Sequence, residues 1–291
     1  MSRANPQSAR GRLVISCADR PGIVAAVSRF LFERGANIVH SDQHTTHPVG
    51  GAFFMRVVFD VPDLATSGVE LERQFTPLAG DFRMDWRLEY ASRRKRLAIF
   101  VSREAHCLLE LLWQGQAGDL EAEIAVVISN HEDLRSVAEG AGVPFLHIPI
   151  TPDRKEAAEQ QQLALVEDRA DVLVLARYMQ ILSPAFLTRW PRRIINIHHS
   201  FLPAFVGARP YDQAHTRGVK LIGATAHYVT TDLDGGPIIE QDVARVDHRA
   251  TVDDLRRIGR SIERVVLARA VRWHVEDRIL VHGNKTVVFP S

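Results

Sequence analysis

The chain has 291 residues, 46% of them hydrophobic and 24% charged, with a formal net charge of +1 at pH 7. This balance is typical of a soluble globular protein with a sizeable core, and it favours neither nucleic acid nor a membrane as partner. No apolar run approaches the roughly 20 residues that cross a bilayer. Cys17 and Cys107 lie far apart, which argues against a disulfide framework and a thiolate zinc site and indicates a reducing, cytoplasmic setting.

The first 91 residues predict a tail followed by a small α/β unit. Residues 1–10 are polar and lack the apolar stretch of a secretory signal, so we expect a disordered tail there. In residues 11–91, apolar patterns predict strands at 13–17, 36–45, 53–59 and 82–90 and helices at 23–31 and 69–78. The order strand, helix, strand, strand, helix, strand is that of a ferredoxin-like unit, in which two helices cover one face of an antiparallel sheet.

A basic run at residues 92–96, Ser-Arg-Arg-Lys-Arg, interrupts this pattern. Such a run is most often a solvated hinge, with a polyanion-binding patch as the alternative. Beyond it, short β-branched stretches alternate with helical ones: strands at 97–101, 124–129, 145–150, 172–176, 194–197 and 224–229, and helices at 107–113, 134–141, 155–167 and 251–275. The alternation predicts a doubly wound, mostly parallel α/β sheet for residues 97–291.

The first turn of this second domain does not resemble a nucleotide site. Residues 101–107 follow the first strand without a single glycine, and Glu104 would repel a phosphate. Neither a GxGxxG pattern nor a P-loop lysine motif occurs in the sequence. We therefore predict that the domain binds neither a dinucleotide nor ATP at this turn.

Polar residues with catalytic potential follow the later strands. Asn196 and His198 are two residues apart at the end of a strand, so their side chains project to the same face. The loop after the strand at 224–229 brings a carboxylate, Asp234 or Asp232. An amide, an imidazole and a carboxylate together can polarise a carbonyl, move a proton and orient a water molecule.

Two other interpretations of the histidines stay open at this level. A histidine after a strand is often only structural. A zinc site would draw on His198, His199, His215 and His227. Their spacing matches no familiar zinc motif, and adjacent histidines on a strand point to opposite faces.

Several motifs resemble the signature of the folate-dependent formyltransferases. They are Asn196-Ile197-His198-His199-Ser200-Phe201-Leu202-Pro203 and Leu233-Asp234-Gly235-Gly236-Pro237. The resemblance implies that Asn196, His198 and Asp234 are the catalytic residues. It also implies a folate pocket that includes the run from Arg177 to Pro184. The candidate substrate-binding residues are Arg177, Tyr178, Met179, Gln180, Ile181, Leu182, Thr225 and His227, with His227 behind the reacting groups.

Two further motifs, Ala105-His106-Cys107-Leu108 and Phe205-Val206-Gly207-Ala208-Arg209-Pro210-Tyr211, are similar to the formyltetrahydrofolate deformylase family. This resemblance implies hydrolysis of 10-formyltetrahydrofolate to formate and tetrahydrofolate, supplying formate for one-carbon and purine metabolism, with no metal and no redox cofactor. The missing phosphate cradle at the first turn favours water as the acceptor. The alternatives are transfer of the formyl group to an amine, or a non-catalytic sensor of folate and amino acids.

The N-terminal unit resembles an ACT domain through Asp19-Arg20-Pro21-Gly22-Ile23. The resemblance implies an amino-acid effector bound near Asp19, Gly22 and Ile23, with methionine and glycine as candidates, and a homo-oligomer, either dimer or tetramer. The alternative is an ordinary tight turn in which Gly22 only permits the helix to begin.

Overall fold

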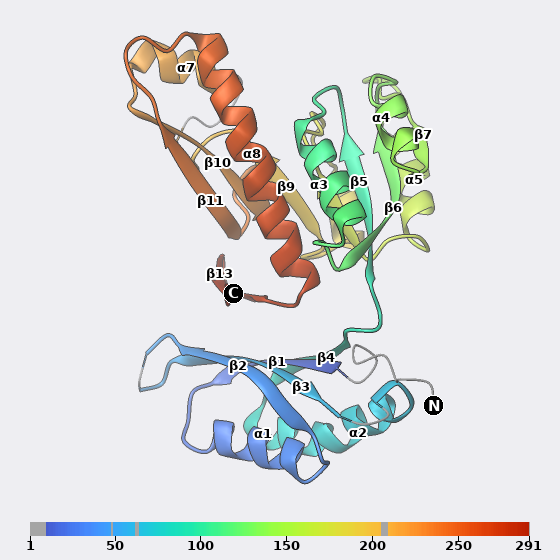
Figure 1. The fold of residues 1–291 in the computed structure, drawn as a ribbon, viewed down its shortest axis with the longest axis vertical. Helices are drawn as coiled ribbons and strands as arrows, with labels where there is room; N and C mark the ends of the chain where they lie inside the picture. Colours follow the sequence, from blue (N-terminus) through green and yellow to red (C-terminus); the bar gives the residue numbers. More distant parts are fainter. Residues whose placement is uncertain (1–9, 48, 62–63, 205–208, 291) are drawn as a thin grey trace. The chain divides into compact units, whose positions relative to one another are not determined.

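The computed structural model describes residues 10–47, 49–61, 64–204 and 209–290. The contacts divide the chain into two compact units (Figure 1). The first runs to Arg94 and includes Asp277–His282 and Val287–Ser291; the second comprises Lys95–Glu276 and Gly283–Thr286. The predicted tail at residues 1–10 lies outside the described residues, apart from Arg10, which begins the first strand.

The first unit has the predicted ferredoxin-like order. Its elements are β1 (Arg10–Ala18), α1 (Ile23–Phe32), β2 (Asn37–Thr45), β3 (Ala52–Asp60), α2 (Leu64–Phe82) and β4 (Asp85–Tyr90). The strands form an antiparallel sheet in the order β2-β3-β1-β4. The helix α2 is longer than predicted, because it continues through Pro77 to Phe82, a residue that the alternating pattern assigned to the last strand.

Apolar side chains cover both faces of this sheet. On the helical face, Leu13 and Ile15 pack with residues of α1 and α2 such as Leu31 and Phe75. On the opposite face, Val14 and Phe54 pack with Leu280 and Phe289 from the end of the chain.

Contacts between charged side chains also connect the end of the chain to the first unit. Asp277 lies 3.7 Å from Nη1 of Arg12 and 3.7 Å from Nε of Arg87. The sequence pattern predicted one domain for residues 97–291; the contacts group residues 277–282 and 287–291 with the first unit instead.

The second unit is a seven-stranded sheet covered by helices. Its elements are β5 (Lys95–Val101), α3 (His106–Ala117), β6 (Ala122–Ser129), α4 (Arg135–Gly140), β7 (Phe145–His147), α5 (Lys155–Val166), β8 (Val172–Leu175), α6 (Pro184–Arg189), β9 (Ile194–His198), α7 (Pro210–Arg217), β10 (Leu221–Tyr228), β11 (Ile238–Arg245) and α8 (Val252–Val275). The strand order is β11-β10-β9-β8-β5-β6-β7, parallel from β9 to β7 and antiparallel at β10 and β11. The predicted doubly wound, mostly parallel sheet is confirmed.

Differences from the predicted elements have local causes. The helices α6 and α7 were not predicted, because each begins at a proline in a sequence that looks like a turn. The edge strand β11 was missed because polar residues occupy its middle, at positions 240–242, and the pair β12 (Ile279–His282) and β13 (Lys285–Val288) was missed because each strand has only four residues. The predicted hinge at residues 92–96 is too long, because Lys95 and Arg96 already belong to β5.

The topology fixes where ligands meet the sheet. The chain passes from β5 through β6 to β7 and then returns to β8 on the other side of β5. Such a reversal opens a crevice at the carboxyl ends of β5 and β8. One face of the sheet carries α3 and α8, which contact each other (Figure 1); the opposite face forms a core with α5 and α6. No helix in the described part of the chain is long and apolar enough to cross a membrane.

Candidate active site

The carboxylate of Asp234 contacts the imidazole of His198. His198 is the last residue of β9 and is buried, with Nδ1 3.2 Å from Oδ2 of Asp234. The hydrogen bond from His198, followed by that from His227, lowers the pKa of Asp234 well below its usual range. The carboxylate is therefore ionised at neutral pH and holds the ring of His198 in one orientation.

A tight loop brings Asp234 to this position. Asp234 has a positive φ of 54°, and a Cβ on Gly236 would lie 1.8 Å from the carbonyl oxygen of Tyr228. Only glycine permits the backbone to approach so closely. The competing carboxylate, Asp232, is exposed, so it is Asp234 that faces the histidines.

Asn196 lies opposite His227 across the β9–β10 pair. His227 has Nδ1 3.0 Å from the backbone carbonyl oxygen of Tyr228, which can only accept a hydrogen bond. Nδ1 therefore carries a proton, and Nε2 lies 3.2 Å from Nδ2 of Asn196 and 3.6 Å from Oδ1 of Asp234. This contact orients the amide of Asn196 beside His227.

His198 keeps one nitrogen available for chemistry. Its Nε2 is buried and has no hydrogen-bond partner among the described residues. When Nδ1 donates to the carboxylate of Asp234, Nε2 of the neutral ring is the basic nitrogen. The geometry therefore provides a group that can accept a proton and return it.

The predicted folate segment after β8 has buried ends and an outward-facing middle. Tyr178 and Leu182 are in the core, and the Tyr178 hydroxyl accepts from Nε2 of Gln162 at 2.9 Å. Met179 and Ile181 are 58% and 62% exposed, with Gln180 between them partly exposed. A ligand can therefore reach Met179, Gln180 and Ile181, the middle residues of this segment.

This segment is held by Ser102, which in turn bonds Asn130; neither residue was selected from the sequence. Ser102, directly after β5, donates to Asn130 Oδ1 at 2.7 Å and accepts from the backbone N–H of Met179 at 3.1 Å. Asn130 directly follows β6. Small polar residues at the ends of neighbouring parallel strands are the sequence signal that identifies such positions.

Thr225 supports the loop after His198. Its buried hydroxyl donates to the carbonyl oxygen of Ser200 at 2.9 Å and accepts from the N–H of Leu202 at 3.0 Å and from Gln241 at 2.9 Å. These three bonds use the full capacity of the hydroxyl. The hydroxyl of Thr225, which was predicted to contact the substrate, therefore makes all its hydrogen bonds within the protein.

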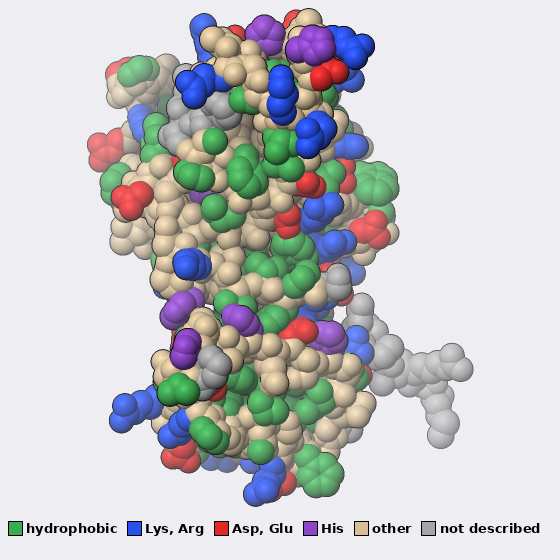
Figure 2. Space-filling view, turned by 90° about the vertical axis from the view of Figure 1, so that its left-hand side faces the viewer, with side chains coloured by type: hydrophobic (Ala, Val, Ile, Leu, Met, Phe, Trp, Pro, Cys, Tyr) green, Lys and Arg blue, Asp and Glu red, His purple; other side chains and the backbone are tan. Residues whose placement is uncertain are grey.

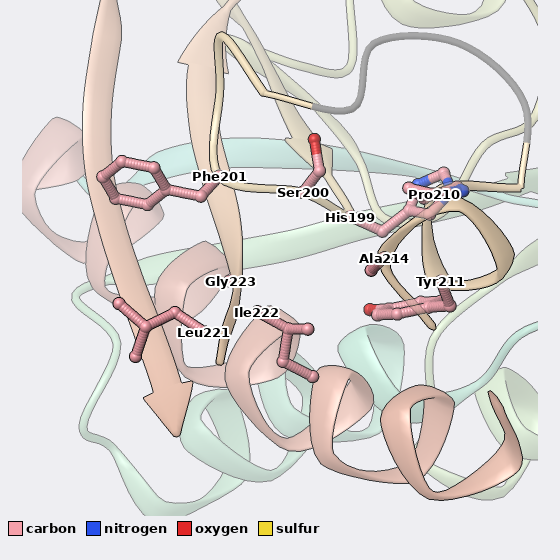
Figure 3. A pocket seen from close by; sticks show the side chains of 9 residues that line it. All are labelled: His199, Ser200, Phe201, Pro210, Tyr211, Ala214, Leu221, Ile222 and Gly223. Carbon is pink, nitrogen blue, oxygen red and sulfur yellow. The ribbon is translucent and has the colours of Figure 1, made fainter. Parts of the chain in front are cut away.

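Beside this loop lies a small pocket (Figure 3). It is lined by His199, Ser200, Phe201, Pro210, Tyr211, Ala214, Leu221, Ile222 and Gly223. Burial, followed by the charge of Arg177, lowers the pKa of His199 to about 4, so this ring is neutral at pH 7. Residues 205–208 of the predicted motif lie outside the described residues.

A second polar cluster surrounds Glu263 of α8. The hydroxyl of Tyr211 donates to Oε1 at 2.6 Å, Nε2 of His106 lies 2.9 Å from Oε2, and Nε of Arg177 lies 3.4 Å from the same oxygen. Burial alone would raise the pKa of Glu263, but the hydrogen bond from His106 and the charge of Arg177 lower it to about 2. The sequence analysis missed Glu263, although its spacing from Gly259 and Leu267 places it on the buried stripe of α8.

The zinc alternative is not supported by the arrangement of the histidines. Within the described ranges, one group of metal-binding side chains comes close enough to hold an ion, namely His106, Cys107 and Glu263. It shares no histidine with the predicted set. Both oxygens of Glu263 already receive hydrogen bonds from the protein.

Basic side chains at the surface are largely neutralised by neighbours. Lys and Arg gather at the top of Figure 2, over the end of the second unit that carries α7 and the start of α8. There Arg256 pairs with Asp212 and Asp253. In the predicted basic hinge, Arg96 pairs with Asp171 at 3.2 Å. These pairs favour solvated ion pairs over a polyanion-binding patch.

The predicted effector residues adjoin the start of α1. Gly22 precedes the helix with φ 96°, and a Cβ there would meet no atom within 4 Å. Asp19 accepts a hydrogen bond from the hydroxyl of Thr45 at 2.8 Å, whereas Ile23 is buried in the core. Asp19 and Gly22 thus border an open helix start, and Ile23 anchors it.

Two families match separate parts of the chain. Residues 95–271 match the formyl transferase family, and residues 11–67 match the ACT domain. The formyl transferase match covers all the proposed catalytic residues, and the ACT match covers the segment around Gly22. An ACT domain at this position suggests binding of a small-molecule effector.

Similar proteins share both parts. A formyltetrahydrofolate deformylase of Bacillus subtilis is 59% identical over 96% of this chain and 94% of its own length; one of Escherichia coli is 44% identical over 94% and 95%. The crystal structure of a formyltetrahydrofolate deformylase from Pseudomonas syringae superposes with a TM-score of 0.92, at 51% identity over 97% of this chain and 94% of that one. A glycinamide ribonucleotide transformylase from Symbiobacterium toebii covers 68% of this chain and 95% of its own, with a TM-score of 0.63 and 33% identity.

Proposed function

The chain belongs to the formyltetrahydrofolate deformylase family, and from that premise we propose that it hydrolyses 10-formyltetrahydrofolate to formate and tetrahydrofolate. The observation that carries the mechanism is the contact of 3.2 Å between His198 Nδ1 and the ionised Asp234. It leaves Nε2 of His198 buried and without a partner among the described residues, ready to exchange a proton with a substrate.

Substrate binding is assigned to the crevice at the carboxyl ends of β5 and β8. The exposed side chains of Met179, Gln180 and Ile181 offer a surface for the folate, and the backbone of this segment can pair with the edge of the pterin ring. Tyr178 and Leu182 fix the two ends of the segment in the core. Thr225 and His227 act from behind, by holding the loop after His198 and the amide of Asn196.

The reaction replaces the bond between the formyl carbon and a folate nitrogen by a bond to water. As water adds to the formyl carbon, Nε2 of His198 takes one of its protons, and Asp234 stabilises the imidazolium. An N–H of Asn196 donates to the carbonyl oxygen as it becomes an oxyanion. His198 then returns the proton to the departing nitrogen, the C–N bond breaks, and the formic acid ionises to formate.

Water is favoured over an amine by the turn after β5. That turn contains no glycine and presents Glu104, so it offers no close cradle for a phosphorylated acceptor. Incubation of the purified protein with 10-formyltetrahydrofolate should release formate in proportion to tetrahydrofolate without any added amine. Dependence on an added amine would identify a transferase, and binding without turnover would identify a sensor.

The first unit is proposed to be the site of regulation, with methionine as activator and glycine as inhibitor, in a cytoplasmic dimer or tetramer. The helix start at Gly22 can hold an amino-acid carboxylate through its backbone N–H groups. Gly22→Asp would place a carboxylate where another must bind. Rate titrations with both amino acids should respond in the wild type and be blunted in Gly22→Asp; an unchanged response would remove Gly22 from the effector site.

A further inference from the structure

The buried face of α5 carries two polar residues at positions where apolar residues are usual. Among the buried residues of this helix, Glu159 and Gln162 lie one turn apart. Glu159 is 5% exposed and Gln162 is 0% exposed. Burying a carboxylate and an amide is unfavourable unless their hydrogen bonds compensate for the lost water. The reaction described above uses neither residue, so their role has to be sought in the groups that they bond.

Each of these side chains bonds one end of the segment that is proposed to bind folate. Nε2 of Gln162 donates to the hydroxyl of Tyr178 at 2.9 Å. Oε1 of Glu159 accepts from the backbone N–H of Ser183 at 3.0 Å. Burial raises the pKa of Tyr178 to about 12, so its hydroxyl is neutral at pH 7 and keeps this contact. One helix therefore holds both ends of residues 178–183.

The two attachments limit the shape of the residues between them. Residues three apart on a helix have Cβ atoms about 5–6 Å apart. The chain from Tyr178 to Ser183 would span about 17 Å if it were extended, so its middle arches away from α5. The exposures of Met179 and Ile181, 58% and 62%, agree with this shape. Ser102 holds the start of the arch, because its hydroxyl accepts from the N–H of Met179 at 3.1 Å.

The contact between Gln162 and Tyr178 contributes direction more than stability. Oε1 of Gln162 is buried and has no hydrogen-bond partner among the described residues. Tyr178 packs in an apolar cluster. A leucine and a phenylalanine of similar shape would fill the same space without an unsatisfied oxygen. A hydrogen bond, however, selects one orientation of the Tyr178 side chain, and with it one path of the backbone that follows.

We propose that Glu159 and Gln162 are positioning residues for folate recognition, which hold the backbone of residues 179–182 in the shape that binds the pterin ring. This inference rests on the proposed function, which places the folate against this segment. A segment that is already ordered loses less conformational freedom when the ligand binds, so its affinity is higher. Proton transfer is assigned to His198 and Asp234. Loss of the α5 side chains should therefore weaken binding much more than it slows the chemical step.

The main test replaces the polar pair by apolar residues of similar shape, Gln162→Leu together with Tyr178→Phe. Removing both partners at once leaves stability nearly unchanged, because no buried group is left unsatisfied. The Kd for tetrahydrofolate and the KM for 10-formyltetrahydrofolate should both rise about tenfold, with a much smaller change in kcat. Gln161→Leu is the matched control, because Gln161 is exposed on the same helix. Urea unfolding followed by circular dichroism gives the stability of each variant.

A second set of variants tests the attachment at the other end. Glu159→Gln keeps a side-chain oxygen that can accept from the N–H of Ser183, so its Kd for tetrahydrofolate should stay close to that of the wild type. Glu159→Leu removes the acceptor and should raise this Kd about tenfold. Glu156→Leu is the control, because Glu156 is exposed one turn earlier on α5.

The outcomes are distinct. Weaker tetrahydrofolate binding at retained stability in the double variant, with affinity kept in Glu159→Gln, supports the inference. Unchanged affinity in the double variant overturns it. A loss of affinity that only parallels a loss of stability also overturns it, since a purely structural pair would behave in this way. Binding of tetrahydrofolate needs no turnover, so these results stand even if the wild type releases no formate, an outcome that would refute the proposed hydrolysis alone. A wild type that binds no tetrahydrofolate would refute both.

Discussion

Two polar clusters of the second unit contrast in how the sequence encodes them. The contacts among Asn196, His198, His227 and Asp234 come from one antiparallel strand pair and the loop that follows it. The cluster around Glu263 draws on α3, α7, α8 and the segment after β8. The first cluster is contained in short motifs that can be read locally. The second exists only once distant helices have packed together.

The two clusters also differ in role: the first can take part in the reaction, whereas the second stabilises the fold. In the first cluster His198 retains an available nitrogen, whereas in the second both oxygens of Glu263 are occupied. We therefore expect substitutions in the first cluster to reduce turnover at nearly unchanged stability. Substitutions around Glu263 should reduce stability first.

The largest effect is expected at Asp234. Asp234→Asn should lower kcat by about a thousandfold or more, because the amide cannot stabilise the imidazolium of His198 in the transition state. Folate affinity should stay within a few-fold, since the ground state makes little use of this carboxylate. Asp232→Asn, at an exposed carboxylate two residues earlier, should retain normal kcat and serves as the control. Near-normal turnover in Asp234→Asn would reverse the assignment of the two residues.

Glu263 should give the largest loss of stability. Glu263→Gln removes the charge that compensates buried Arg177, and breaking a buried pair on one side commonly costs about 3 kcal/mol or more. Tyr211→Phe deletes one hydrogen bond to Glu263 and should cost about 1–2 kcal/mol. Urea unfolding followed by circular dichroism measures both. A destabilisation by Tyr211→Phe that exceeds that of Glu263→Gln would mean that packing, not charge, dominates this cluster.

The stability contributed by Glu263 should depend on pH in a defined direction. Its folded pKa of about 2 lies below the ordinary value of 4.5, so the stabilisation is complete above the ordinary value and is lost as pH falls towards the folded one. The stability difference between wild type and Glu263→Gln should therefore shrink as pH decreases through this window. Glu139→Gln on α4, at an exposed carboxylate, is the control. A difference that is constant with pH would contradict an ionised Glu263.

The sequence predicted most of the fold because the buried strands and long helices carry strong apolar periodicity. It missed β11 because polar residues occupy the middle of that edge strand, and it missed α6 and α7 because their first residues form turn-like sequences with proline. The candidate catalytic residues followed from motifs. The cluster of Glu263, Tyr211 and His106 could not be assembled in this way, because the partners are 52 and 157 residues from Glu263 and meet only through tertiary packing.

The smallest effect on turnover is expected at Thr225, which belongs to the catalytic region in sequence but resembles the Glu263 cluster in its bonding. Thr225→Val keeps the shape of the side chain and removes the hydroxyl that bonds Ser200, Leu202 and Gln241. Leaving these buried groups unsatisfied should cost about 1–3 kcal/mol of stability. Turnover should fall only a few-fold, because the loop after His198 becomes less well held. Gln241→Leu removes the bond to Thr225 from the other side, together with one to the carbonyl oxygen of Leu202, and should have a similar effect. If Thr225→Val instead raises KM strongly at unchanged stability, the hydroxyl contacts the substrate directly, and the division between chemistry and support does not hold within this strand.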